Sequence, residues 1–211
     1  MRLLDLYCGA GGAARGYADA GFEVVGVDIA PQPNYPYEFY RADALDFLAW
    51  GASDFDAIHA SPPCQAYSQA QRIRNREHPD LIGATRQALA QTGKPYVIEN
   101  VVGSPLHNPV MLCGAMFPEL RVYRHRLFES SFPLTAPEDP PHYWPLCKMG
   151  RPPLQGEFMH VVGNFSGAQY ARNAMGIPWM ARNELREAIP PAYTNFVGRQ
   201  LLASLREGMA A

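Results

Sequence analysis

Residues 2–16 read RLLDLYCGAGGAARG, and this stretch decides the fold. From Leu3 to Tyr7 it is apolar except for Asp5, which predicts a buried strand. The glycines that follow predict a tight turn, and the residues from there to about Ala20 predict a helix. Glycines let the backbone turn sharply and let a ligand approach it closely. The stretch therefore predicts an α/β fold with a candidate ligand site at the turn.

The turn also fits a nucleotide-binding pattern. Gly9 to Ala14 have the GxGxxA spacing of a dinucleotide-binding loop, although such a turn also occurs with nothing bound. Asp28 ends the next predicted strand, residues 22–29, about 20 residues after the glycines, where an acidic residue holds ribose hydroxyls. The alternative is a helix cap, which Pro31 and Pro33 disfavour because no helix follows at once.

Asp43 ends a third predicted strand and has two possible roles. A carboxylate at that position can accept a hydrogen bond from an adenine amino group. It can equally serve as the N-cap of a predicted helix over residues 45–50. The sequence leaves both roles open.

Cys64 stands at a stiff corner of the chain. An apolar run over residues 55–60 predicts a buried strand, and Pro62-Pro63-Cys64-Gln65 follows it. Prolines cannot donate to a sheet ladder, so they end the strand. In α/β sheets ligands and chemistry collect at the carboxyl ends of strands. Cys64 is therefore a candidate nucleophile, and the alternative is a small apolar residue at a turn.

Four predicted strand ends converge on one rim. After Cys64, residues 66–78 are polar and carry three arginines, which predicts either a loop that closes over a phosphate-bearing substrate or a solvated surface loop. A helix over 81–91 and a strand over 95–98 lead to Glu99. Parallel strands would place Gly9, Asp28, Cys64 and Glu99 side by side. We expect one site that combines a nucleoside cofactor, a thiolate and a carboxylic acid.

The composition limits the classes of protein to which this chain can belong. The 211 residues, 47% of them hydrophobic, suffice for one domain with a sizeable core. A net charge of -2 argues against nucleic-acid binding by bulk charge alone, though not against a local basic patch. The four cysteines form no CxxC pair and are expected to be reduced. We expect no signal peptide and no membrane partner, hence a cytoplasmic protein.

An ordered set of motifs resembles a known family. The motifs are Asp5-Leu6-Tyr7-Cys8-Gly9-Ala10-Gly11-Gly12, Pro62-Pro63-Cys64-Gln65, Glu99-Asn100-Val101 and Arg124-His125-Arg126. In this order they resemble the DNA (cytosine-5) methyltransferases, in particular short variants from bacteriophages and bacteria that take part in restriction-modification. Residues 189–198 resemble the family's last motif more loosely. The resemblance implies a Rossmann-like class I S-adenosylmethionine-dependent methyltransferase fold in one domain, with a core of about 1–130 and 164–211 and a small recognition insert of about 131–163.

The resemblance also implies the chemistry of the site. A thiolate at Cys64 would add to C6 of cytosine so that C5 can accept the methyl group of S-adenosylmethionine. Glu99, with a pKa above that of a free glutamate, would act as an acid at N3. Arg124 and Arg126 would brace O2 and a phosphate. The target base would leave the helix stack, unless the DNA is single-stranded.

The cofactor residues implied by the resemblance form a longer set. They are Tyr7, Gly9 and Gly11 at the methionine end, Asp28 and Ile29 at the ribose, Asp43 and Ala44 at adenine, and Pro63, Leu81 and Asn195 around them. Three positions depart from the family pattern. Tyr7 replaces the usual phenylalanine, Asp28 the usual glutamate, and Val122 a supporting glutamine.

The proline-rich insert is much smaller than the family's recognition domain. This predicts a very short recognition sequence, a preference for single strands, or a partner that supplies specificity. Tyr143, Trp144, Lys148 and Arg151 could stack on bases or contact phosphate, or the insert could be an ordered loop over the core. His142 and Cys147 are only two potential metal ligands, so we expect no metal.

Other functions remain to be weighed. The nearest alternative is a cytosine-5 methyltransferase that acts on RNA, such as transfer RNA. A catalytically idle protein that binds S-adenosylmethionine or nucleic acid is a second, which the presence of Cys64, Glu99 and both arginines disfavours. A NAD dehydrogenase would fit the glycine turn but would leave Pro62-Pro63-Cys64 without a role.

Overall fold

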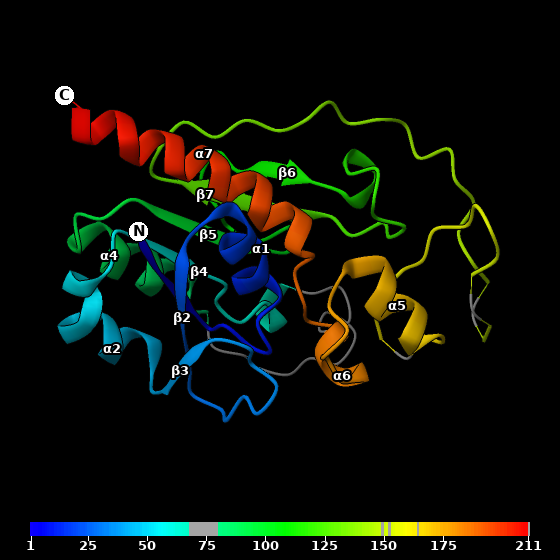
Figure 1. Cartoon of the computed structure of the whole chain (residues 1–211), viewed down its shortest axis with the longest axis horizontal. Coiled ribbons are helices and arrows are strands. Elements are labelled where there is room, and N and C mark those ends of the chain that lie inside the picture. Colours follow the sequence, from blue (N-terminus) through cyan, green and yellow to red (C-terminus); the bar gives the residue numbers. More distant parts are fainter. Residues whose placement is uncertain (68–79, 149, 152, 164, 211) are drawn as a thin grey trace.

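A seven-stranded sheet with the order β3-β2-β1-β4-β5-β7-β6 forms the centre of the protein (Figure 1). The structure is a computed structural model, and it describes residues 1–67, 80–148, 150–151, 153–163 and 165–210. The strands are β1 (Arg2–Leu6), β2 (Glu23–Asp28), β3 (Glu38–Arg41), β4 (Ala57–Ala60), β5 (Tyr96–Asn100), β6 (Val110–Leu112) and β7 (Arg126–Ser130). The first five are parallel, and β7 runs antiparallel to both of its neighbours.

Helices cover both faces of this sheet. They are α1 (Gly12–Ala20), α2 (Ala44–Gly51), α4 (Ile82–Gln91), α5 (Ala168–Met175), α6 (Arg182–Leu185) and α7 (Pro191–Ala210), with short 3-10 turns at Ala52–Asp54, Gln65–Tyr67 and Gly114–Met116. α7 lies along α1 on one face, and α2 packs beside α4 on the other (Figure 1). The predicted Rossmann-like α/β fold is confirmed.

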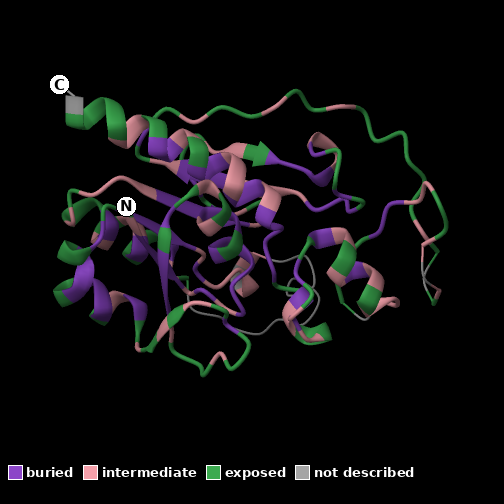
Figure 2. Ribbon diagram, viewed as in Figure 1, coloured by how far each residue is buried: buried purple, intermediate pink, exposed green. Residues whose placement is uncertain are grey.

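Burial follows from this layering. The central strands β1, β4 and β5 are buried at nearly every residue, because a parallel sheet between two helix layers has no solvent-facing side (Figure 2). Alternate residues therefore serve different cores: Leu3 packs with α1 and α7, whereas Leu4 packs with α2 and α4. Asp5 is buried in the same strand.

Glycine permits the close contact of α1 with α7. A Cβ atom at Gly16 would overlap the carbonyl oxygen of Pro191 and the hydroxyl of Thr194. Thr194 also donates a hydrogen bond of 2.9 Å to the carbonyl of Ala13. α7 begins at Pro191, where a missing N–H costs nothing at a helix start.

The segment after β7 is irregular. The described residues between 131 and 163 form no helix or strand, and two isolated bridges, Val122 with Met159 and Leu146 with Phe158, tie it to its surroundings. Figure 1 shows it leaving the sheet and returning at α5. The C-terminal part then forms α5, with eight residues, and α6, with only four. No helix in the described ranges has the length and apolar character needed to cross a membrane.

Candidate active site

A cavity of about 380 Å³ opens where the parallel strands end. Eight of the predicted site residues line it: Tyr7, Gly9, Asp28, Ile29, Pro63, Cys64, Glu99 and Arg126. They come from the ends of β1, β2, β4 and β5 and from the start of β7, as the predicted convergence required. A second hollow of about 460 Å³ lies between α2 and α4, but none of its lining residues carries an ionisable side chain.

The glycine turn forms one wall of the cavity and is held by Asp28. The backbone N–H of Gly9 donates to Asp28 Oδ2 at 3.1 Å, and that of Ala30 donates to Oδ1 at 2.9 Å. Asp28 therefore supports the turn and caps no helix. A Cβ at Gly9 would meet nothing within 4 Å, so this backbone is open to a ligand.

The backbone around the turn is unusual. Tyr7 has a φ of 56°, in the left-handed region that non-glycine residues rarely adopt, and its hydroxyl lies 3.0 Å from the hydroxyl of Thr85. Gly11 has a φ of 84°, and a Cβ there would lie 2.9 Å from Pro36. Gly11 shapes the turn, although it does not line the cavity. Such conformations concentrate at functional sites.

Cys64 and Glu99 share the opposite wall with Arg126. Arg126 Nε lies 2.9 Å from Glu99 Oε1 in a largely buried ion pair. Burial raises the pKa of the Cys64 thiol, while Arg126 lowers it and Glu99 raises it further. Burial also raises the pKa of Glu99, and Arg126 opposes that shift. The free site thus favours a neutral thiol and a Glu99 that binds a proton more readily than an ordinary glutamate.

A buried hydrogen-bond chain reaches Glu99 from inside the sheet. The hydroxyl of Tyr17 lies 2.9 Å from Nδ1 of His59, and Nε2 of His59 lies 2.8 Å from the hydroxyl of Ser61. Burial lowers the pKa of His59 to about 3, so the ring is neutral. A neutral ring that accepts from Tyr17 donates to Ser61, whose hydroxyl is then free to donate to Glu99.

The Pro-Pro-Cys corner is held from the neighbouring strand. Asn100 Nδ2 donates to the carbonyl of Pro62 at 2.8 Å, and its Oδ1 accepts from the N–H of Val101 at 2.9 Å. Because Asn100 is buried in β5, these bonds fix the end of β5 against the corner that carries Cys64. Asn100 therefore holds the corner in place through its side-chain amide.

Arg124 lies differently from Arg126. Its guanidinium is buried and donates to the carbonyl oxygens of Val161 at 2.8 Å and Arg186 at 2.6 Å. Burial lowers its pKa to about 9. Arg124 does not line the cavity, so the predicted contact with a base is not supported. Its donors are used by these two backbone carbonyls and not by a ligand. Arg124 thereby links the insert, at Val161, to the segment after α6, at Arg186.

Four predicted cofactor residues also lie away from the cavity. Asp43 accepts from the N–H groups of Leu45 and Asp46 at 2.8 and 3.2 Å, so its N-cap role is confirmed. Ala44 is the first residue of α2 and is buried in the core, and Leu81 directly precedes α4. Asn195 is on α7 and donates to the carbonyl of Gly16 at 3.4 Å. None of the four is among the residues that line the cavity.

Several cavity residues were not predicted. Asp5, Ser61 and the segment Arg186–Ile189 line it. Asp5 was visible as the one polar residue of an apolar strand, and the segment directly precedes the Ile189-Pro190-Pro191 motif. Trp179 donates to the carbonyl of Ala10 at 2.9 Å and fixes the glycine turn from the C-terminal part. The predicted arginine loop, with Arg72, Arg74 and Arg76, lies outside the described residues.

The N-terminal part of the sequence matches a known family. Residues 1–103 match the C-5 cytosine-specific DNA methylases. The matched residues include Gly9, Asp28, Cys64 and Glu99, which all line the cavity.

Individual methylases are similar over shorter stretches. Type II methyltransferase M.AgeI of Thalassovita gelatinovora is 26% identical over 121 residues, which cover 49% of this chain and 28% of that protein. Type II methyltransferase M.FnuDI of Fusobacterium nucleatum is 30% identical over 86 residues, 37% of this chain and 25% of that protein. The matches therefore span only about a quarter of these relatives' lengths.

A solved structure extends the likeness of fold to nearly the whole chain. A candidate DNA modification methyltransferase encoded within an E. coli prophage superposes with a TM-score of 0.67, covering 98% of this chain and 99% of that one at 13% identity. At this identity the likeness concerns the fold alone. Because the superposition covers nearly the whole chain, it includes the insert and the C-terminal helices.

S-adenosylmethionine is the methyl donor that the methylase family implies, and the cavity fits it. The open backbone at Gly9 and the carboxylate of Asp28 suit a nucleoside, as in other α/β cofactor sites. Asp5 Oδ1 is buried in the cavity wall without a hydrogen-bond partner among the described residues. A polar group of a bound cofactor would supply that partner.

Proposed function

We propose that the chain is a DNA (cytosine-5) methyltransferase in which Cys64 bonds covalently to C6 of the target base. The observation that carries this proposal is the single cavity between the glycine turn and the Cys64 corner. A methyl donor on the turn and a base beside Cys64 would then face each other. The match of residues 1–103 to the C-5 cytosine-specific DNA methylases supports DNA as the substrate.

The proposed reaction begins at Cys64. Its thiolate forms a bond to C6, and the electrons of the C5–C6 double bond move into the ring as N3 takes a proton from Glu99. When bound, S-adenosylmethionine would supply an electrophilic methyl group, so that C5 gains a carbon–carbon bond as the sulfur–methyl bond breaks and S-adenosylhomocysteine leaves. Transfer of the C5 proton to water and return of the N3 proton to Glu99 then let the Cys64–C6 bond break, which restores the aromatic ring and the thiolate.

The residues around Cys64 and Glu99 suit this sequence. Arg126 contacts Glu99 and lowers the pKa of Cys64, which favours the attacking thiolate. Burial holds the pKa of Glu99 above its ordinary value, which favours the protonated acid. Closure of a base over the cavity would exclude water from both groups and strengthen these electrostatic effects.

The direct test uses methyl-labelled S-adenosylmethionine with duplex DNA, single-stranded DNA and RNA in separate reactions. Nucleosides are then separated and identified by mass spectrometry. We expect the label in 5-methylcytosine from one DNA form. Label only in RNA would replace the proposed substrate with the RNA alternative. Absence of label from every nucleic acid, with the cofactor bound by calorimetry, would contradict the proposed activity of this chain.

A further inference from the structure

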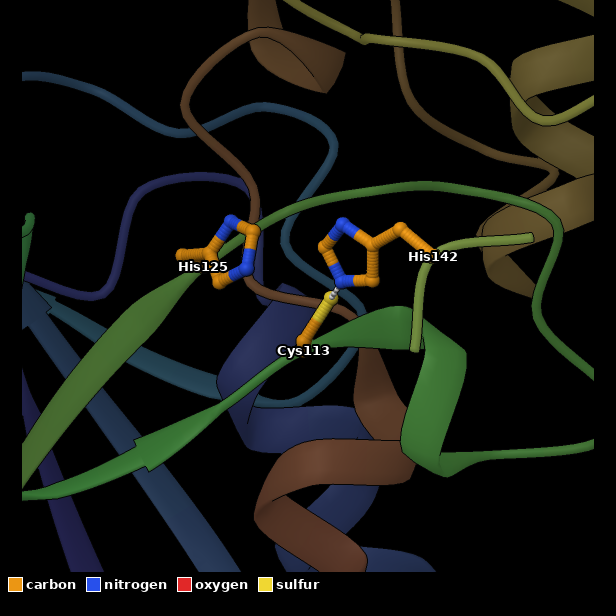
Figure 3. Close-up of side chains that lie close together, drawn as sticks. All are labelled: Cys113, His125 and His142. Carbon is orange, nitrogen blue, oxygen red and sulfur yellow. Dashed lines mark hydrogen bonds between the residues drawn. The ribbon is translucent and has the colours of Figure 1, made fainter. Parts of the chain in front are cut away.

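Three potential metal ligands from distant segments meet beside the antiparallel edge of the sheet (Figure 3). Cys113 directly follows β6, His125 directly precedes β7, and His142 belongs to the proline-rich insert. Their ligand atoms all lie within 4.8 Å of one another, and the Cys113 sulfur lies 3.3 Å from His142 Nε2. None of the three lines the proposed active-site cavity.

We propose that Cys113, His125 and His142 bind one zinc ion. One thiolate and two imidazoles suit zinc, whereas magnesium and calcium prefer oxygen ligands. Zinc bonds of the usual lengths place tetrahedral ligand atoms roughly 3.3–3.6 Å apart. The 3.3 Å between the Cys113 sulfur and His142 Nε2 already meets this distance, and the other pairs of ligand atoms, which lie within 4.8 Å, would close to it on binding.

The surroundings hold the ligands in place. The ring of Tyr123 stacks on that of His142 with centroids 4.1 Å apart, and the rings of His125 and His142 lie 5.1 Å apart. The hydroxyl of Tyr123 donates to the carbonyl of Trp144, two residues beyond His142. Tyr123 therefore fixes both the ring of His142 and the backbone that carries it, as residues around metal ligands commonly do.

The ligand count predicts an open fourth position. The structure brings three protein ligands together within its described ranges, and His142 is exposed, so a water molecule can reach the ion. Cys147, which the sequence paired with His142, is not part of the group. It donates its backbone N–H to Phe158 and packs against the core.

A zinc ion here would join the insert to the sheet. His142 would be tied to both ends of the loop that joins β6 to β7, because Cys113 begins this loop and His125 ends it. His125 also stands between Arg124, which binds the insert through Val161, and Arg126, which lines the cavity. The ion would therefore fix the insert relative to the proposed active site. The zinc site itself does not depend on the proposed methyl transfer.

The test is metal binding by the purified full chain. Metal is removed with a chelator, and zinc is returned in competition with a chromophoric chelator to obtain stoichiometry and affinity. Cobalt(II) is added in a parallel sample, because thiolate ligation gives it a strong near-ultraviolet charge-transfer absorption. The variants are Cys113→Ser and His142→Ala. The controls are Cys147→Ala and His107→Ala, which keep the group intact.

We expect one zinc ion per chain, a thiolate–cobalt absorption, and loss of affinity by roughly 100-fold or more in His142→Ala. The controls should bind like the parent. His142 is exposed, so its variant tests the site even if replacement of the buried Cys113 prevents folding. Absence of stoichiometric zinc, or cobalt spectra without the thiolate absorption, would overturn the proposal. Equal affinity in the parent and His142→Ala would do the same.

Discussion

Arg126 is the charge that connects the two reactive groups of the proposed site. It pairs with Glu99 at 2.9 Å and lowers the pKa of both Glu99 and Cys64. The proposed mechanism needs a deprotonated Cys64 and a protonated Glu99. Because a thiol has a much higher pKa than a carboxyl group, this active form is a minority at every pH. The rate should therefore rise with pH up to the pKa of Glu99, stay level, and fall above the pKa of Cys64.

Replacement of Arg126 should move this whole profile. Arg126→Gln removes the charge that lowers both pKa values, so both limbs of the pH–rate profile should shift to higher pH, by about one unit. Arg126→Lys keeps the charge without the planar fork and should shift less. Steady-state rates across pH measure both limbs. A profile that stays in place in Arg126→Gln would contradict the role given to this charge.

Ser61 should affect only one limb. Its hydroxyl lowers the pKa of Glu99 and is not among the causes that shift Cys64. In Ser61→Ala the acid limb, which follows Glu99, should move to higher pH by less than about one unit, while the alkaline limb stays unchanged. Ser61→Thr, which keeps the hydroxyl, is the control. Equal movement of both limbs would show that Ser61 acts on the site as a whole.

Asp28 should affect cofactor binding. Asp28→Ala removes the acceptor of the Gly9 and Ala30 N–H groups and the proposed ribose contact. Affinity for S-adenosylmethionine should fall roughly tenfold or more, as measured by calorimetry. Asp19→Ala, which breaks an exposed ion pair with Arg15 on α1, should bind like the parent. Unchanged affinity in Asp28→Ala would remove this residue from the cofactor site.

At the scale of elements, the contact of α1 with α7 positions two parts of the cavity lining, the glycine turn and the segment before α7. The glycine turn leads into α1, and the segment Arg186–Ile189 leads into α7. Gly16 lets the helices approach closely, because a side chain there would overlap Pro191 and Thr194. Packing of these two helices therefore sets the distance between the two sides of the site.

Two glycine-to-alanine changes test this contact. Gly16→Ala should lower the free energy of unfolding by about 3 kcal/mol, because the new methyl group overlaps backbone. Gly83→Ala in α4 adds a methyl group that meets nothing within 4 Å and should stabilise by up to ~1 kcal/mol. Urea unfolding measures both. A Gly16→Ala protein as stable as Gly83→Ala would show that the helices are not in close contact.

The parallel strands and most helices could be predicted because local patterns specify them. The apolar runs at β1 and β4, the glycine turn and the Pro62-Pro63 corner each act within a few residues. The role of Asp43 could not be predicted, because a helix cap and a ligand contact use the same residue type at the same place. The position of the Arg124 side chain could not be predicted either, because its partners, the carbonyls of Val161 and Arg186, are distant in the sequence.

At the scale of the whole molecule, long-range contacts complete the cavity. The lining residues range from β1 to the segment before α7. Contacts between residues so far apart in the sequence cannot be predicted from local sequence patterns. The triad of Cys113, His125 and His142 was invisible for the same reason. The net charge of -2 leaves nucleic-acid binding to local groups, among which Tyr143 and Trp144 are exposed on the insert.

The central claim is the covalent bond between Cys64 and the target base. A DNA oligonucleotide with 5-fluorocytosine at the methylated position blocks the last step, because fluorine cannot leave as the C5 proton does. With S-adenosylmethionine, intact-mass spectrometry should find a complex of protein, oligonucleotide and one methyl group. Peptide mapping should place the bond at Cys64, and Cys64→Ser should form no complex. If ordinary cytosine is methylated while the fluorinated DNA forms no adduct, the covalent mechanism is wrong.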